Sequence, residues 1–575
     1  MFQKILIANR GEIAVRIIRA CRGLGIRTVA VYSEVDQPAL YVQQADESYP
    51  LGDPQPQQSY LNIPKLIEVA RQAKVDAIHP GYGFLSENAR FAEACAQAGI
   101  VFIGPTPAVI KQMGDKIGAR NILKNKGFPL VPGTNQPLVA VGEAVQFAAE
   151  AGYPVLLKAA AGGGGKGMRV VQRAEDLPAA LEGCQREAKS AFGDDRVFLE
   201  KYLLEPRHVE IQIIADQHGN VRHLFERECS IQRRHQKVIE ETPSPALDET
   251  LRQKMGEAAV KIARLIGYQS VGTIEFILDK NRDFYFLEVN TRLQVEHPIT
   301  EMITGVDLVK AQIRIAAGEK LDAIVGAYCN TPLQTRGHAI ECRICAEDPE
   351  NNFLPSIGKI THLREPAGDG VRVDSGIFAG WEIPVEYDPM LAKLIVHAPT
   401  RPLAIRKMLE ALGHYEIDGV KTNIPFLRDL LRHPEFSAGQ TDTGFIPRNF
   451  PEWVPGRFDG EDPFNPWQRG DGWRLGGTVG AALCGRPVRE GNHIGLPLPK
   501  PVRTPKHALT APMPGKVIKI SVVVGDTVKE GDLLVVMEAM KMEHSIQANR
   551  AGIVKQLFFQ VGDKVGMGEK LVEIA

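Results

Sequence analysis

Two glutamates flank a short polar turn near the middle of the chain. Glu275 lies in the strand-like stretch 273–278, Glu288 lies in the stretch 284–289, and the turn 280–283 separates them. If the hairpin is symmetric about this turn, residue 275 pairs with residue 288, and the two carboxylates oppose each other on one face. Because like charges repel, the pair invites a cation. Hard oxygen ligands without His or Cys indicate Mg²⁺ or Mn²⁺ that holds nucleotide phosphates.

The residues after Glu288 alternate in a way that places further polar groups beside it. If the chain stays extended, a period of two puts Glu288, Asn290, Arg292, Gln294 and Glu296 on one face. That face would carry metal ligands, an anion binder and a candidate base in sequence. The competing interpretation is the solvent-facing side of an amphipathic strand. It predicts mixed solubilising residues, but it does not predict an opposed pair of glutamates.

A glycine-rich loop, 161–167, lies between two strand-like stretches, 153–158 and 168–171. It formally contains G-x-G-x-x-G, but the strand–loop–strand order excludes the helix-dipole mode of a Rossmann site. It also fails the Walker pattern, because Met168 stands where Ser or Thr should follow Gly-Lys. We expect a flap whose backbone N–H groups, together with Lys158, approach phosphate oxygens. A flexible surface loop is the alternative interpretation.

Two further stretches carry groups that suit a nucleotide. Residues 200–203 offer a carboxylate and backbone groups near a potential adenine. The loop 229–237 packs four potential cations between two strand-like stretches: Arg233, Arg234, His235 and Lys237. A run of charges is usually a solvated face, but its position between strands makes an anion-binding loop credible.

Lys541 lies between two methionines, in the connection between two similar halves. Residues 511–537 repeat at 548–574, 37 positions later, with ten identities and no gap. Each half reads as short strands broken by glycine turns, and one half has too few strands to bury a core. The halves are therefore expected to pack as a small sandwich, with Lys541 exposed at the tip of a hairpin. A solubilising lysine is the alternative, but a turn tip gives no packing reason for Met540 and Met542.

The first hundred residues alternate between strands and helices. The expected strands are 4–8, 27–32, 75–78 and 100–103, and the expected helices are 13–24, 61–73 and 86–98. This alternation predicts a parallel, doubly wound sheet. The first strand is not followed by a full G-x-G-x-x-G, which disfavours dinucleotide binding.

The bulk composition is that of a globular protein with several domains. The chain has 575 residues, 44% of them hydrophobic and 24% charged, with a net charge of −1. Such a balance has no basic footprint for nucleic acid. No apolar run of 18 residues predicts a membrane span, and the N-terminus has too short an apolar run for a signal peptide. The eight cysteines are scattered, Cys342-x-x-Cys345 alone is weak evidence for zinc, and we expect reduced thiols in a cytoplasmic protein.

The C-terminal repeat resembles a biotin carboxyl carrier domain. The resemblance is carried by Ala539-Met540-Lys541-Met542 between the two halves, and it implies that Lys541 carries covalent biotin. Lipoyl domains share the fold, but they usually place the lysine between an acidic and a small residue. The Met-Lys-Met context favours biotin.

Residues 1–447 resemble biotin carboxylase of the ATP-grasp superfamily. The motifs that carry this resemblance are Asn9–Ala14, His79–Gly83, the glycine-rich loop, the 229–237 loop, Glu288–His297 and Glu341-Cys342-Arg343. The implied fold class is α/β and α+β, with a Rossmann-like N-terminal domain (1–114), an ATP-grasp domain (115–330) with a lid at about 131–203, and a C-terminal domain (331–447). A Pro/Gly-rich linker or truncated docking segment (448–507) and an all-β biotinyl/lipoyl-type sandwich (508–575) would follow.

The same resemblance implies roles for individual residues. The ATP-binding residues would be Lys116, Lys158, Gly164, Gly165, Glu200, Lys201, Tyr202, Leu203, His208 and His235. Glu275, Glu288 and Asn290 would hold Mg²⁺ or Mn²⁺. Lys237, Arg292, Gln294 and Val295 would position bicarbonate. Glu296 would deprotonate bicarbonate, and Arg343 would hold biotin and stabilise its enolate-like form; Glu296, Arg292, Arg343 and Lys237 form the catalytic set.

The implied activity is ATP- and bicarbonate-dependent carboxylation of biotin on the chain's own carrier domain. Because no second catalytic domain follows Ala575, we expect an acyl-CoA acceptor (acetyl-, propionyl- or methylcrotonyl-CoA) and a separate carboxyltransferase β-subunit. Tyr387–Lys393 resembles the version found in acyl-CoA carboxylase α-subunits. Other expected partners are biotin protein ligase and a second copy of the chain.

Several alternatives stay open at this stage. A two-subunit pyruvate carboxylase or a urea-type carboxylase would use the same chemistry. A catalytically inert carrier or scaffold is an alternative of another class, which the intact set of charged residues argues against. A general ATP-grasp ligase would have no use for the carrier domain.

Overall fold

The computed structural model describes residues 1–161, 167–325, 335–456, 509–539, 542–566 and 568–575. The predicted glycines Gly164 and Gly165, the attachment residue Lys541 and nearly all of the 448–507 segment lie outside the described residues. The chain divides into two compact units, Met1–Asp459 and Gly460–Ala575, which are considered separately. Among the described residues, no helix is long and apolar enough to cross a membrane.

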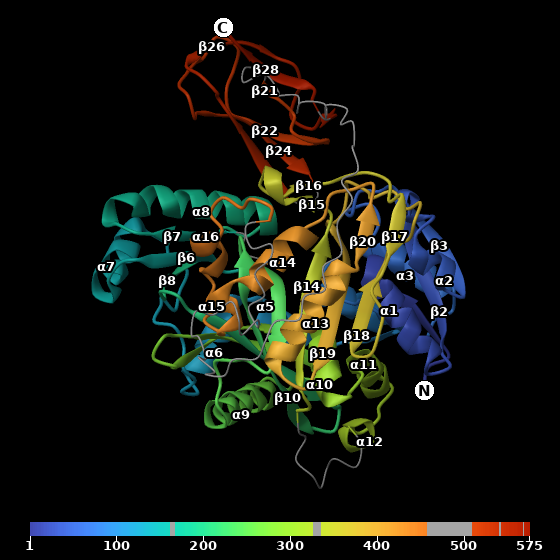
Figure 1. Ribbon diagram of the computed structural model, residues 1–575. Coiled ribbons are helices and arrows are strands. Elements are labelled where there is room, and N and C mark those ends of the chain that lie inside the picture. The colour runs from blue at the N-terminus through green and yellow to red at the C-terminus, as the bar shows by residue number, and fades with distance from the viewer. Residues whose placement is uncertain (162–166, 326–334, 457–508, 540–541, 567) are drawn as a thin grey trace, which may run out of the picture. The chain divides into compact units, whose positions relative to one another are not determined.

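The N-terminal part of the first unit is a five-stranded sheet in the order β3-β2-β1-β4-β5 (Figure 1). All four strand pairings are parallel, so the predicted parallel sheet is confirmed. Its core is apolar because the strands are covered by helices and lose their contact with water. Its strands are β1 (Lys4–Ile7), β2 (Arg27–Ser33), β3 (Glu47–Gly52), β4 (Ala77–His79) and β5 (Val101–Phe102). Its helices are α1 (Gly11–Arg22), α2 (Leu40–Gln44), α3 (Ile63–Gln72), α4 (Ala89–Gln97) and α5 (Pro107–Gly114), with a 3₁₀ turn at Glu34–Asp36.

The strand β3 was not expected from the sequence. Its residues, Glu-Ser-Tyr-Pro-Leu-Gly, contain a proline and few apolar side chains, and they alternate between exposed and partly buried positions. An edge strand tolerates such a composition, because one side of its backbone needs no partner.

The centre of the first unit is an eight-stranded antiparallel sheet in the order β13-β12-β9-β10-β11-β14-β19-β18 (Figure 1). Its strands are β9 (Arg207–Ala215), β10 (Val221–Arg233), β11 (Gln236–Thr242), β12 (Ser270–Leu278), β13 (Phe284–Asn290), β14 (His338–Cys345), β18 (Val371–Ser375) and β19 (Met390–Ala398). The pairing of β11 with β14 joins two stretches that are far apart in the sequence. One continuous sheet can therefore bring side chains from both stretches to a single face.

Helices and short strand pairs surround this sheet. The helices are α9 (Glu249–Leu265), α10 (His297–Thr304), α11 (Leu308–Ala316), α12 (Leu321–Val325), α13 (Arg401–Gly413), α14 (Ile424–Arg432), α15 (Pro434–Ser437) and α16 (Phe445–Asn449). The strand pairs are β15 (Glu347–Asp348) with β16 (Leu354–Pro355) and β17 (His362–Arg364) with β20 (Glu416–Asp418), and Pro349–Asn351 forms a 3₁₀ turn.

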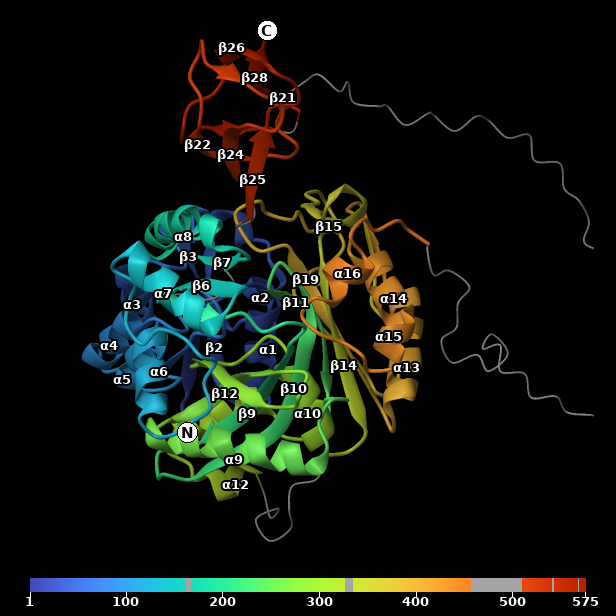
Figure 2. The ribbon, with the colours of Figure 1, turned by 90° about the vertical axis from the view of Figure 1, so that its left-hand side faces the viewer.

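A separate three-stranded sheet, β7-β6-β8, carries the ends of the glycine-rich loop (Figure 1; β6 and β7 also in Figure 2). β6 (Val155–Ala159) and β7 (Met168–Val171) pair antiparallel, which confirms the predicted strand–loop–strand order. β8 (Val197–Lys201), α7 (Val141–Ala151) and α8 (Leu177–Phe192), with a 3₁₀ turn at Ala174–Asp176, complete an apolar core of its own. The helix α6 (Lys116–Lys124) precedes this region, and Asp115 caps it by accepting a hydrogen bond from the Gly118 amide.

The second unit is a sandwich of two four-stranded sheets, β21-β28-β26-β23 and β25-β24-β22-β27. Its strands are β21 (Leu509–Thr510), β22 (Gly515–Ile520), β23 (Thr527–Val528), β24 (Leu533–Ala539), β25 (Met542–Gln547), β26 (Gly552–Leu557), β27 (Lys564–Val565) and β28 (Lys570–Ile574). Shifting β22, β23 and β24 by 37 positions gives β26, β27 and β28, so the sequence repeat is a structural repeat. Each sheet takes one short strand from the other half, and the two halves share one apolar core as predicted.

Candidate active site

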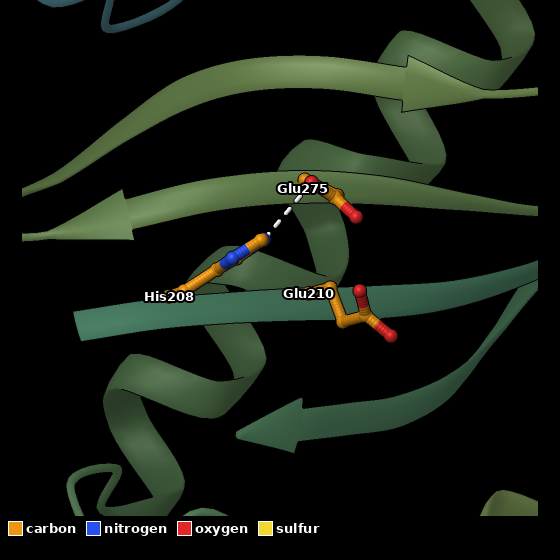
Figure 3. Close-up of side chains that lie close together, drawn as sticks. All are labelled: His208, Glu210 and Glu275. Carbon is orange, nitrogen blue, oxygen red and sulfur yellow. Dashed lines mark hydrogen bonds and ion pairs between the residues drawn. The ribbon is translucent and has the colours of Figure 1, made fainter. Parts of the chain in front are cut away.

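Three neighbouring strands of the central sheet place three glutamates side by side. Glu275 on β12 is the partner of Glu210 on β9 and of Glu288 on β13. The predicted opposition of residues 275 and 288 is therefore confirmed. Figure 3 shows Glu275 beside Glu210, with His208 of β9 directed at the Glu275 carboxylate. The His208 Nε2 atom lies 2.9 Å from Glu275 Oε2.

Lys237 on β11 lies at the centre of the acidic cluster. Its ammonium donates to Glu210 Oε2 at 2.5 Å, to Glu275 Oε1 at 3.0 Å and to Glu296 Oε1 at 2.6 Å. Burial lowers the pKa of Lys237, but the negative groups around it outweigh burial and hold its pKa well above the usual range. This cation therefore reduces the repulsion among three carboxylates, together with Arg227 on Glu210 and Arg343 on Glu296.

Glu296 is fully buried and held by two cations. Besides Lys237, Arg343 on β14 donates from Nη2 to Glu296 Oε2 at 2.9 Å. Burial raises the pKa of Glu296, but Lys237 and Arg343 outweigh it and hold the pKa well below its usual range. Glu296 is also the residue before helix α10, whose positive end favours a carboxylate. The side chain is therefore an ionised acceptor with both oxygens directed at cations.

The segment between β13 and α10 brings the remaining predicted residues together. β13 ends at Asn290, so the chain does not stay extended through residue 296 as the alternation assumed. The side chains converge all the same: Arg292 donates to Asn290 Oδ1 at 3.1 Å and to Gln294 Oε1 at 3.0 Å. Gln294 in turn donates to Glu275 Oε1 at 3.0 Å. Folding of the segment, rather than strand alternation, gathers the set.

The predicted nucleotide-binding residues form two ion-paired groups. Lys116, at the start of α6, lies 3.2 Å from Glu288 Oε2. Lys158 on β6 pairs with Glu200 on β8, which also accepts from Arg120. Burial raises the pKa of Glu200, but the two cations outweigh it and lower the pKa below its ordinary value.

The other predicted nucleotide-binding residues, and Val295 of the bicarbonate set, lie outside these two ion-paired groups. His235 lies in the turn between β10 and β11 with a left-handed backbone (φ 63°), and burial and the charge of Lys158 lower its pKa. Lys201 donates to the Gly152 carbonyl at 2.7 Å, and the Tyr202 amide donates to the Pro154 carbonyl at 3.2 Å. Leu203 is half-buried in the connection between β8 and β9. The Val295 carbonyl accepts from Lys393 Nζ at 3.0 Å.

The donor set of this cluster fits a hard divalent cation. In the described part of the chain, the ligand atoms of His208, Glu210 and Glu275 lie within 4.8 Å of one another, as do those of Glu210, Cys229 and Glu296. Carboxylate oxygens dominate both groups, as Mg²⁺ and Mn²⁺ require. Glu288 belongs to neither group, and its carboxylate is paired with Lys116. The predicted ligand set Glu275, Glu288 and Asn290 thus stays a prediction.

Sequence reasoning missed several charged residues of the site. Glu210 is fully buried between Lys237 and Arg227. The Arg227 Nε atom lies 2.5 Å from Glu210 Oε1. Glu87 accepts from Arg292 Nε at 2.9 Å. Glu240 accepts from Arg343 Nε at 2.7 Å, and burial raises the pKa of Glu240 to about 7. A signal existed only for Glu210, because polar residues alternate with apolar ones at His208, Glu210 and Gln212 of β9.

The carrier unit holds its own candidate site at one hairpin. β24 and β25 pair antiparallel, and Ala539 is the partner of Met542, so residues 540 and 541 connect the two strands. Lys541 itself lies outside the described residues. The flanking strands confirm the predicted hairpin on both sides of it.

Family comparisons agree with these two sites. Residues 1–110 match the family described as biotin carboxylase, N-terminal domain, and residues 341–448 match the biotin carboxylase C-terminal domain. Residues 115–324 match the ATP-binding domain of the carbamoyl-phosphate synthase L chain. Residues 507–574 match the family described as biotin-requiring enzyme.

Individual relatives cover most or all of the chain. It is 55% identical over 446 residues to a subunit of pyruvate carboxylase from Methanothermobacter thermautotrophicus, covering 78% of this chain and 90% of that one. It is 42% identical to the mitochondrial methylcrotonoyl-CoA carboxylase alpha subunit of Dictyostelium discoideum, covering 98% and 94%. Among solved structures, the biotin carboxylase domain of Hydrogenobacter thermophilus 2-oxoglutarate carboxylase, in complex with MgADP and bicarbonate, is 49% identical, with a TM-score of 0.76, covering 78% and 98%.

The fold and the buried charge cluster define an ATP-grasp ligase, a class that activates a carboxylate with ATP. The relatives narrow this class further. The chain belongs to the biotin carboxylase family, and it carries a biotinyl domain in the same polypeptide. It is a biotin carboxylase that uses ATP and covalent biotin, in the manner of acyl-CoA carboxylase α-subunits.

Proposed function

We propose that this chain carboxylates biotin on its own Lys541, with Glu296 as the base for bicarbonate. The observation that carries the proposal is the buried Glu296 carboxylate between Lys237 and Arg343, in a chain that also holds a carrier hairpin around residue 541. An ionised carboxylate can take a proton. The Lys237 ammonium and the Arg343 guanidinium beside it can hold an anionic substrate.

The charge cluster suits activation of bicarbonate by ATP. Bicarbonate would bind among Lys237, Arg292, Gln294 and the Val295 amide, and Glu296 would accept its proton. A bicarbonate oxygen then bonds to the γ-phosphorus while the bond from that phosphorus to the β–γ bridging oxygen breaks, which releases ADP with the electron pair. The mixed anhydride breaks at its carbon–oxygen bond and yields CO₂ and phosphate. Positioning and charge neutralisation supply most of the rate in such a transfer.

The other predicted residues would bind the nucleotide and its metal. The group Lys116, Lys158, Glu200–Leu203, His208 and His235, together with Gly164 and Gly165, would hold ATP. Glu275, Glu288 and Asn290 would hold Mg²⁺ or Mn²⁺, which neutralises phosphate charge when bound. Lys116 and Lys237 would exchange carboxylate partners for phosphate or bicarbonate.

Covalent biotin, when bound, would supply a ureido nitrogen whose proton goes to the released phosphate and whose electron pair forms the new bond to the carbon of CO₂. Arg343 would hold this group, because its guanidinium is always charged and already lies 2.9 Å from Glu296. It would therefore place biotin beside the CO₂ and the phosphate. The division of labour would follow the domains 1–114, 115–330, 331–447 and 508–575.

The acceptor is proposed to be an acyl-CoA, carboxylated by a separate carboxyltransferase β-subunit. The methylcrotonoyl-CoA carboxylase relative, an alpha subunit, matches 98% of this chain. Its alignment spans 664 positions, 89 more than the 575 residues here, so that relative holds at least 89 residues without a counterpart. This difference in length supports a docking segment that is shorter in this chain, and we place it within 448–507.

A two-subunit pyruvate carboxylase is the second candidate. It is favoured by the 55% identity to the pyruvate carboxylase relative over the first three domains. The discriminating experiment is capture of the biotinylated chain on streptavidin from its native source, followed by assay of the bound material. Carboxylation of an acyl-CoA but not of pyruvate supports the first candidate, and the reverse supports the second.

The cytoplasm, a homo-oligomer and modification by biotin protein ligase complete the proposal. Free thiols at all six cysteines in the described part of the chain support a reducing compartment. The related 2-oxoglutarate carboxylase domain is a dimer in its solved structure. Fractionation of native cells and the hydrodynamic mass of the purified chain test these two points.

A further inference from the structure

A half-buried cation on β14 and a fully buried cation on β19 lie directly opposite each other. Arg343 and Lys393 are partners in this antiparallel pair, so their side chains leave the sheet on the same face. The side chain of Lys393 is fully buried, and that of Arg343 is 18% exposed. Opposed like charges destabilise a sheet, and a buried ammonium loses its hydration. Such a pair therefore needs partners that compensate both effects.

The two cations bind two consecutive residues of the catalytic segment. Arg343 Nη2 donates to the Glu296 carboxylate at 2.9 Å, and Lys393 Nζ donates to the Val295 carbonyl at 3.0 Å. One cation thus holds the side chain of the base, and the other holds the peptide group that precedes it. Because a peptide group is planar, fixing the Val295 carbonyl also fixes the direction in which the Glu296 backbone leaves it.

The compensating charges of Lys393 come from two other parts of the first unit. Its ammonium lies 3.3 Å from Glu12 Oε2 on α1 and 3.9 Å from Asp374 Oδ2 on β18. The Tyr82 ring centroid is 5.8 Å away. These groups balance the charge of Lys393 and are separate from the residues predicted to bind bicarbonate or nucleotide. Within the described part of the chain, the hydrogen bond to Val295 joins this ammonium to the candidate active site.

We propose that Lys393 is a positioning residue for the carboxylation reaction, which acts through the Val295 carbonyl to aim the Glu296 base. This inference rests on the proposed function, because it assumes that Glu296 takes the proton of bicarbonate. The backbone on both sides of residues 295 and 296 is fixed, because Gln294 donates a hydrogen bond to Glu275 and α10 begins at His297. Rotation of the 295–296 peptide would turn the carboxylate away from Lys237 and Arg343.

The test removes the hydrogen bond from Lys393 to the Val295 carbonyl and keeps the buried charges balanced. Lys393→Met with Glu12→Gln eliminates the ammonium and its carboxylate partner together, and Glu12→Gln alone is the matched control that keeps the bond to Val295. ATP cleavage dependent on bicarbonate and free biotin is measured with the full chain. The double variant should lose about 30-fold in kcat, with KM for ATP changed by less than about threefold. Glu12→Gln alone should stay within about threefold of wild type in kcat.

The outcomes separate this inference from the proposed function. A folded double variant whose kcat equals that of Glu12→Gln overturns the positioning role. If the double variant yields no folded protein, Lys393→Gln is measured instead; it should lose about tenfold in kcat, and an unchanged kcat overturns the inference. Glu296→Gln is assayed alongside. If Glu296→Gln keeps full turnover, the proposed base and this inference both fall, whereas a loss there with full turnover in the lysine variants removes the inference alone.

Discussion

The two units of this chain are stabilised in opposite ways. The carrier sandwich buries only apolar side chains among the residues whose burial is described there, around Leu534, Val535 and Val572. The catalytic unit buries many charged groups, with Arg227, Glu210 and Glu296 among them. The carrier therefore resembles a simple folding module that presents one hairpin. The catalytic unit buries these charged groups although they lose their hydration. It needs them because bicarbonate and ATP are both anions, and charged side chains must hold them together.

The difference teaches where function and stability can be separated. Removing one partner of a buried ion pair leaves an uncompensated charge, so a change at the catalytic cluster affects both folding and turnover. In the carrier, the apolar core carries the fold, and the function is proposed for Lys541 in the connection between β24 and β25. The two roles therefore belong to different residues there.

The largest expected effect belongs to the base. Glu296→Gln should lower kcat/KM for bicarbonate by roughly 10²- to 10⁴-fold, because the amide cannot accept the proton. Steady-state ATP cleavage with bicarbonate and free biotin measures the loss. Glu226→Gln is the control, since Glu226 is buried on the same sheet but pairs with Arg252 away from the cluster. Equal activities in the two variants would contradict the role of Glu296.

The next effect separates the carrier from the catalytic unit. Leu534→Ala should lower the stability of the carrier by about 2–5 kcal/mol, because it leaves a cavity in an apolar core. The carrier transition in a thermal scan should fall by more than about 10 °C. Turnover on free biotin should not change. Loss of that turnover would show that the two units do not fold independently.

The catalytic unit should become less stable in acid because of Glu241, which lies on β11 where this strand pairs with β14. Burial raises the pKa of Glu241, but Arg401 and His338 outweigh it and lower the pKa to about 2. Because this folded-state pKa lies below the unfolded value of 4.5, the stabilisation is fully present above about pH 4.5 and is lost as the pH falls toward 2. The linkage corresponds to about 3 kcal/mol.

Denaturant unfolding between pH 5 and pH 3 checks this linkage. Glu241→Gln should reduce the acid dependence of the catalytic transition, and it should leave the carrier transition of the same chain unchanged. A wild-type catalytic transition that does not weaken on acidification would contradict the assignment.

The smallest effect tests the internal symmetry of the carrier. Gly525 and Gly562 occupy equivalent turns with φ of 100° and 105°, and an added Cβ would meet no atom within 4 Å at either position. Alanine should therefore cost only backbone strain, about 1–2 kcal/mol at each site. Thermal scans of Gly525→Ala and Gly562→Ala should agree within about 0.5 kcal/mol. A large difference would show that the halves are not energetically equivalent.

The sequence predicted the carrier better than the catalytic cluster. The 37-residue repeat implied two packed halves, because neither half can bury a core alone. The 275–288 opposition followed from a symmetric hairpin, which is a local feature. By contrast, Lys393, Glu87 and Glu240 reach the site from elements far apart in the sequence, and no local periodicity marks such contacts. The 291–296 segment failed the strand alternation because it folds into a turn before α10.

The most direct test of the account is self-carboxylation at Lys541. The full chain, produced with a competent biotin ligase, should carry one biotin by intact mass, and Lys541→Ala should carry none. With ATP and labelled bicarbonate, label should appear on the wild-type chain and be absent from both Lys541→Ala and biotinylated Glu296→Gln. An unmodified wild-type chain, or label that persists in either variant, would contradict the account.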